Sequence, residues 1–129
     1  MGDSRLYRFE DACFVEHTVD HRLRELLLKE GLYSESDVHA HPGAHLMYAC
    51  LGAGPHSPRL PIASRGISRR EGFLLCGDGL WENVDKADLE AIFKAKDLAG
   101  ALRSVVSRAR TRGGEYCDNI SVAAVRRVD

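Results

Sequence analysis

Two acidic residues occupy positions in the sequence where a metal ion could bind. Asp78 lies just beyond the apolar run at 73–76 and has a glycine on each side, and Asp118 lies just before the apolar residues of the last predicted strand. A carboxylate at the end of a buried strand is held rigidly, and its glycine neighbours let backbone and ligand approach closely. Divalent cations require oxygen ligands at fixed positions, with room for bound waters. Because aspartates also serve turns and helix caps, spacing alone leaves both interpretations open.

Hydropathy patterns predict the strands that would position these two residues. Short runs at 5–10 and 13–17 around an acidic turn are typical of a β-hairpin. The continuous apolar run at 73–76 favours a strand that is covered on both faces. The polar segment at 34–43 is expected to be irregular. Further strands are predicted at 45–52, at 62–68 and within 117–128, with a Gly-Pro-rich loop at 52–61.

Helical periodicity predicts three helices. In the first, Asp20 is expected to cap the helix and Gly31 to end it in the left-handed conformation. The second covers 85–96 and carries its apolar residues on one face. The third is capped by Asp97, follows the i, i+3, i+4, i+7 pattern and stops at the glycine pair 113–114. This order of elements lacks regular βαβ alternation, so it predicts an α+β fold and not a doubly wound parallel sheet.

Length and composition are typical of one globular domain, expected to span residues 1–129. The 18 Lys+Arg nearly balance 19 Asp+Glu, and the net charge of -1 argues against nucleic-acid binding or a polybasic membrane patch. No apolar run approaches the ~20 residues that span a bilayer, and the start lacks a secretory signal, so a cytoplasmic protein is expected. The four cysteines form no CxxC pair and are predicted to be reduced and mostly buried.

Four short motifs occur in an order that resembles the C-terminal half of a known enzyme family. They are GDSRLYR at 2–8, TVDH at 18–21, LLCGDGLWE at 74–82 and DNIS at 118–121. Together they resemble the PP2C (PPM) family of metal-dependent serine/threonine protein phosphatases, bacterial type. The resemblance implies a β-sandwich of two antiparallel sheets flanked by helices. It also implies two Mg²⁺ or Mn²⁺ ions that activate a bridging water to attack the phosphoester of a phosphoprotein substrate.

The resemblance assigns roles to four acidic residues. Asp78 and Asp118 match two aspartates that bind the metal pair in the family. Asp3 and Glu82 match acidic positions that, with Asp78, hold an accessory third ion in some members. Glu82 stands where many relatives have aspartate.

The sequence also departs from the family pattern. It contains neither the Asp-Gly-x-Gly-Gly motif, whose aspartate bridges both metals, nor the upstream arginine that grips the substrate phosphate. The chain is therefore expected to supply part of a metal site and to have little or no activity alone. Half a sandwich would leave strand edges and an apolar face uncovered, which predicts self-association, pairing with an N-terminal phosphatase half, or a fragment of a longer gene product. The alternative is a small self-sufficient two-layer fold.

Several alternatives compete with this interpretation. The chain could be a catalytically silent PP2C-like interaction module. His39, His41 and His45 could bind zinc, but no fourth ligand is evident and a solvated loop is favoured. Trp81 is expected to be a core anchor, and Arg5 a structural ion-pair partner and not a phosphate clamp. A solvated basic face is expected for the arginines of the last helix, Arg103, Arg108, Arg110 and Arg112.

Overall fold

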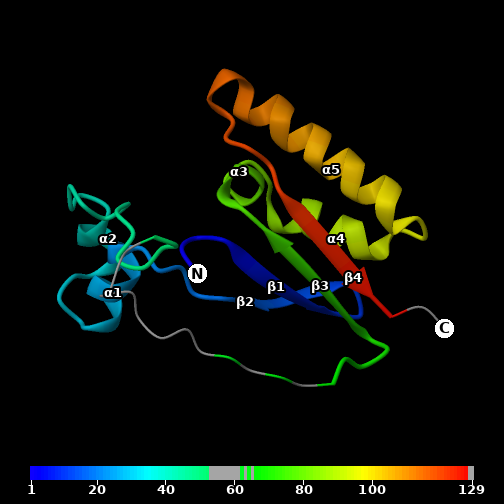
Figure 1. The fold of residues 1–129 in the computed structure, drawn as a ribbon, viewed down its shortest axis with the longest axis horizontal. Helices are drawn as coiled ribbons and strands as arrows, with labels where there is room; N and C mark the ends of the chain where they lie inside the picture. The colour runs from blue at the N-terminus through cyan, green and yellow to red at the C-terminus, as the bar shows by residue number, and fades with distance from the viewer. Residues whose placement is uncertain (53–61, 63, 65, 128–129) are drawn as a thin grey trace. The chain divides into compact units, whose positions relative to one another are not determined.

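The computed structural model describes residues 1–52, 62, 64 and 66–127 (Figure 1). The chain divides into two compact units. Unit 1 comprises Met1–Asp3 and Val19–Ser64, and unit 2 comprises Ser4–Thr18 and Arg65–Asp129. The predicted Gly-Pro-rich loop lies outside the described residues except for its first position.

Unit 2 is built on an antiparallel sheet with strand order β2-β1-β3-β4 (Figure 1). The predicted hairpin is confirmed, because its two turn residues, Asp11 and Ala12, have φ angles of 49° and 62°. Positive φ at both positions is the geometry of a type I′ turn, which matches the twist of the flanking strands. The strands are β1 (Arg5–Glu10), β2 (Cys13–His17), β3 (Glu71–Cys76) and β4 (Val122–Arg126).

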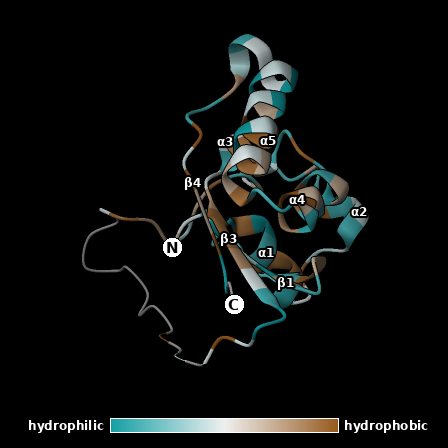
Figure 2. Cartoon of the chain, turned by 90° about the vertical axis from the view of Figure 1, so that its right-hand side faces the viewer, coloured by the Kyte–Doolittle hydropathy of each residue, from teal (hydrophilic) through white to brown (hydrophobic). Residues whose placement is uncertain are grey.

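Helices cover one face of this sheet and form the core with it. They are α3 (Asp78–Trp81), α4 (Lys86–Lys94) and α5 (Leu98–Gly113), followed by the 3₁₀ turn η2 (Gly114–Tyr116). Phe9 and Leu74 from the sheet and Leu80 and Ile92 from the helices are fully buried. Burying such side chains stabilises the fold by roughly 1.5–3 kcal/mol each. In Figure 2, β3 stands out as an apolar strand beside these helices.

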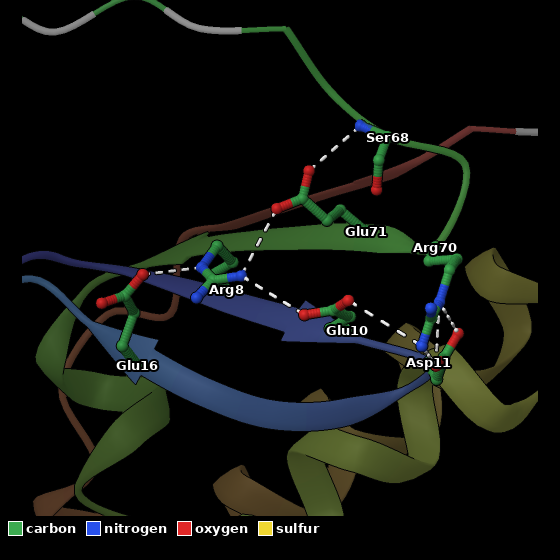
Figure 3. A network of polar contacts seen from close by, with 7 residues as sticks. All are labelled: Arg8, Glu10, Asp11, Glu16, Ser68, Arg70 and Glu71. Carbon is green, nitrogen blue, oxygen red and sulfur yellow. Dashed lines mark hydrogen bonds and ion pairs between the residues drawn. The ribbon is translucent and has the colours of Figure 1, made fainter.

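The opposite face of the sheet is only partly covered, so the prediction that residues 73–76 are buried on both faces is wrong. Leu75 is 50% exposed and its partner Leu6 on β1 is 40% exposed, and Val125 on β4, which pairs with Phe73, is 51% exposed. Farther along the same face the side chains are charged. Figure 3 shows the Arg8 guanidinium between the carboxylates of Glu16, at 2.6 Å, and Glu71, at 3.4 Å.

The predicted aspartate cap of α5, Asp97, is confirmed, and Asp85 caps α4 in the same way. The Asp85 carboxylate accepts a hydrogen bond from the Asp88 backbone N–H at 2.9 Å, and the Asp97 carboxylate accepts one from Gly100 N–H at 3.0 Å. Asp88 closes the reciprocal bond to Asp85 N–H at 3.2 Å, which completes a capping box. The helix α5 ends at the glycine pair as expected, with Gly114 at a φ of 57°.

Unit 1 contains α1 (Leu23–Lys29) and α2 (Glu35–Val38). Asp20 does not cap α1, because Arg22 holds the N-cap position, although Gly31 follows the helix with the expected positive φ of 66°. The predicted strand at 45–52 is wrong, since only Met47 forms an isolated bridge, to Arg22. The described residues of 62–68 form no strand either, and the segment expected to be irregular contains α2.

The four cysteines are free, as predicted, but they are less buried than expected. Cys76 is buried, whereas Cys50 and Cys117 are half-buried and Cys13 is exposed. Burial raises the pKa of the Cys76 thiol to about 12, although the charge of Arg5 opposes the shift. Such a thiol is unreactive at neutral pH. No helix in the described part of the chain is long and apolar enough to cross a bilayer.

Asp88 links two helices, which makes its charge important for stability. The buried Asp88 carboxylate is paired with Arg108 and Arg112 of α5. Burial acts to raise its pKa, but hydrogen bonds from the Asp85 backbone N–H and the two arginines outweigh burial and lower it.

We predict that Asp88→Asn lowers the free energy of unfolding by about 1–2 kcal/mol at pH 7, because the arginines lose their anionic partner. Because the native pKa is lowered, the stabilisation is complete above the unfolded pKa of about 4 and is lost as the pH falls through the lower native pKa, where the difference should disappear. Urea unfolding at pH 7 and at low pH measures the difference in the free energy of unfolding, with exposed Glu115→Gln as the control. An unchanged difference at low pH would contradict the charge-pair explanation.

Candidate metal centre

Asp78 lies where the apolar strand β3 meets the short helix α3. Gly77 is the N-cap residue and Asp78 is the first residue of the helix. One oxygen of the Asp78 carboxylate accepts a hydrogen bond from Gly79 N–H at 2.9 Å. The buried side chain of Leu80 anchors the helix in the core, so the backbone that carries Asp78 is held firmly.

Asp118 lies in the segment that leads into β4. Its side chain is exposed, and its carboxylate accepts a hydrogen bond from Asn119 N–H at 2.6 Å. Gly77 N–H donates to Ser121 C=O at 3.2 Å, so the pairing of β3 with β4 continues up to the candidate site. Because β3 and β4 are antiparallel, the last residue of β3 lies beside the first residue of β4. The two candidate ligands therefore lie at the same end of these strands.

Gly79 brings the two acidic segments into direct contact. A Cβ atom at this position would lie 2.6 Å from the carbonyl oxygen of Asn119 and 2.7 Å from that of Asp118. Only a glycine allows two backbones to approach this closely. The sequence showed that Asp78 has a glycine on each side. It did not show that one of these glycines, Gly79, would contact the segment of Asp118.

Aromatic and amide side chains also hold the segment that carries Asp78. Trp81 packs against the core as predicted, and the Arg5 guanidinium lies 3.5 Å from the centre of its ring. Arg5 also donates to the Tyr7 hydroxyl at 3.2 Å, so it connects β1 with α3. Asn83 donates from its side chain to Gly79 C=O at 3.0 Å. Sequence analysis missed Asn83, which carries no motif of its own.

The other two predicted ligands lie in different units. Glu82 is exposed at the C-terminal end of α3, and its N–H donates to Asp78 C=O at 3.0 Å. Asp3 belongs to unit 1, where its carboxylate accepts a hydrogen bond from Arg22 at 2.8 Å. Unit 2 therefore contains Asp78, Asp118 and Glu82 together.

The donor set suits part of a site for a hard divalent cation. Mg²⁺ is commonly bound through one or two carboxylates while it keeps several waters, and Asp78 and Asp118 offer oxygen ligands only. Among the described residues no group of three histidine, cysteine or acidic side chains forms a complete metal site. His39, His41 and His45, considered for zinc, lie in the described part of the chain and belong to no such group, and His41 accepts a hydrogen bond from Gly43 N–H at 3.1 Å.

Comparison with known proteins identifies the class to which this arrangement belongs. No protein-family model matches the chain. The serine/threonine phosphatase Stp of Listeria innocua is 32% identical over 128 residues, which make up 98% of this chain and 50% of that protein. The structure of the S. agalactiae serine/threonine phosphatase superposes with a TM-score of 0.79 at 26% identity, over 97% of this chain and 51% of that one.

A structure of the PstP catalytic domain in complex with two manganese ions is also similar, with a TM-score of 0.66 and 26% identity over 95% of this chain and 49% of that one. The chain is thus homologous to bacterial PP2C-type serine/threonine phosphatases and shares their α+β fold. It spans about half the length of the curated relatives it matches. The resemblance inferred from the four motifs is confirmed.

Gly79 and Gly77 offer a matched test of the contact between the two acidic segments. We predict that Gly79→Ala destabilises the fold by about 1–3 kcal/mol, because the new methyl group overlaps two carbonyl oxygens. Moving the segments apart should also weaken Mn²⁺ binding by about tenfold or more. Gly77→Ala should do neither, since a Cβ there meets no atom within 4 Å.

Trp81 is the single tryptophan of the sequence, so its quenching by Mn²⁺ can report binding in all three proteins. Urea unfolding gives the stability. Equal Mn²⁺ affinity in the two alanine variants would show that the contact does not organise a metal site.

Proposed function

We propose that the chain forms the C-terminal half of a PP2C-type phosphatase domain that hydrolyses phosphoserine and phosphothreonine in proteins with Mg²⁺ or Mn²⁺. The observation that carries this proposal is the contact through Gly79 between the segments of Asp78 and Asp118. Homology to serine/threonine phosphatases supports the reaction, and the two manganese ions in the PstP structure support the choice of metal.

In this proposal the acidic side chains have distinct tasks. Asp78 and Asp118 offer carboxylate oxygens from neighbouring segments, each fixed by a backbone N–H that leaves further lone pairs available. Glu82 and Asp3 are candidates for holding an accessory third ion. When bound, a pair of divalent cations supplies an activated water and neutralises charge on the phosphoryl group.

Two parts of such a site must come from elsewhere. The sequence has no Asp-Gly-x-Gly-Gly motif, so it offers no aspartate to bridge two metals, and it lacks the matching arginine for the phosphate. We propose that an N-terminal phosphatase half supplies both. The isolated chain is then expected to orient neither the water nor the phosphate well enough for rapid turnover.

An assay with a complementing half tests this proposal. The probe is the half of the Listeria innocua phosphatase that the match does not cover, mixed with this chain, Mn²⁺ and a phosphothreonine peptide. We expect turnover from the mixture and at least about 100-fold less from either piece alone. Asp78→Asn and Asp118→Asn should each remove about 100-fold or more of the activity, because each deletes an anionic metal ligand.

Glu115→Gln is the control for these two variants, since Glu115 is exposed and lies outside the candidate site. Its activity should equal that of the unchanged chain. Full activity in Asp78→Asn would overturn the assigned ligands. A stable mixture without turnover would instead favour the catalytically silent interaction module.

A further inference from the structure

Asn83 holds the backbone of Gly79 from the C-terminal end of α3. Its side-chain amide donates to Gly79 C=O at 3.0 Å, whereas its own N–H donates to Leu80 C=O at 3.0 Å. In a continued α-helix the Asn83 N–H would have bonded to Gly79 C=O instead. The side chain therefore supplies the donor that the end of the helix takes away, and it fixes the position of this carbonyl group.

Asn83 also contacts the segment that carries Asp118. The residue before Asp118 is Cys117, whose Sγ lies 4.0 Å from the Asn83 amide nitrogen and 3.9 Å from the Gly79 carbonyl oxygen. In Figure 1 the segment between α5 and β4 passes beside α3. Asn83 therefore touches both parts of the candidate metal centre, the segment of Asp78 and the segment of Asp118.

The end of α5 limits the positions that Asn83 can take. Gly113 is the last residue of α5, and a Cβ there would lie 2.7 Å from Cys117 Cβ and 2.9 Å from Asn83 Oδ1. Arg112 donates to Asn83 C=O at 3.3 Å and is also paired with the buried Asp88. Side chains packed this closely cannot shift without moving their neighbours. Asn83 is therefore held on one side by α5 while it holds Gly79 on the other.

We infer that Asn83 is a positioning residue that sets the spacing of Asp78 and Asp118 and thereby selects the cation by size. The inference rests on the proposed function and assigns Asn83 a role within its metal site. The amide nitrogen bonds to Gly79 C=O and Oδ1 lies next to Gly113, so Asn83 acts through the backbone and not as a metal ligand.

The geometry that each cation requires connects this spacing with selectivity. Mg²⁺ demands near-ideal octahedral geometry with ligands at about 2.0–2.1 Å, whereas Ca²⁺ accepts a flexible shell at about 2.3–2.6 Å. Carboxylates on firmly spaced segments favour the small cation, and carboxylates on segments that can separate tolerate the large one. Without the Asn83 amide, Gly79 and the Asp78 carboxylate beside it are less firmly placed. Mg²⁺ should then lose more affinity than Ca²⁺.

Displacement of bound Mn²⁺ tests the inference on the full chain without substrate. Mn²⁺ binding is followed by the quenching of Trp81, and Mg²⁺ or Ca²⁺ is then titrated in to displace it. We expect Asn83→Ala to weaken Mg²⁺ binding about tenfold or more and Ca²⁺ binding about threefold or less, so that the ratio of the two affinities falls. Gly113→Ala is a second variant, which pushes on Asn83 from α5 and should lower the ratio as well.

Ile92→Val is the matched control, because it removes one methyl group from the core on α4 and changes no residue of the candidate site. The loss of one methyl group and the loss of one hydrogen bond destabilise a fold to a similar extent, and urea unfolding of both variants checks the match. Partial unfolding lowers the affinity for both cations alike. Ile92→Val should therefore leave the Mg²⁺ to Ca²⁺ ratio unchanged.

An unchanged ratio in Asn83→Ala, or an equal change of the ratio in Ile92→Val, would overturn the inference. Absence of Mn²⁺ binding by the unchanged chain would overturn it too. These results are separable from failure of the proposed function, which is tested by turnover in the mixture with the Listeria half. A lowered ratio without turnover would refute the function alone, whereas turnover with an unchanged ratio would refute only the positioning role of Asn83.

Discussion

The close approach of Gly79 to the carbonyl oxygens of Asp118 and Asn119 is the constraint on which the candidate site depends. It joins the end of β3 to the start of β4 without an intervening side chain. Leu80 on one side and the β3–β4 ladder on the other keep these backbones from separating. Two acidic residues that are 40 positions apart in the sequence therefore belong to one small rigid region.

In the rest of unit 2 the hydrophobic core lies on only one face of the sheet. Helices bury one face of the sheet, while Leu6, Leu75 and Val125 on the other face stay about half exposed. The charged side chains around Arg8 lie farther along the same face. An exposed apolar sheet face is costly in isolation, and so is a strand edge such as that of β4, with which no described strand pairs. Both features agree with homology to only half of a larger domain.

Local chemistry could be predicted from the sequence, and long-range contact could not. The cap Asp97 could be predicted because a cap is decided within four residues. The prediction for Asp20 was wrong, because this favourable capping residue stands two positions before Arg22, which is the N-cap residue of α1. The family motifs indicated Asp78 and Asp118, whereas the support from Arg5 and Asn83 depends on packing between distant elements.

Placing two carboxylates on touching segments has an electrostatic consequence for stability. In the proposed site both carboxylates would face one cation, and without it their like charges would repel, although the N–H groups of Gly79 and Asn119 already bond to them. A cation that binds both carboxylates removes the repulsion and stabilises the folded state in proportion to its occupancy. Metal binding and the packing of the two segments are therefore coupled. In the proposed complete domain, a partner that adds further ligands would strengthen both the metal binding and the packing of the two segments.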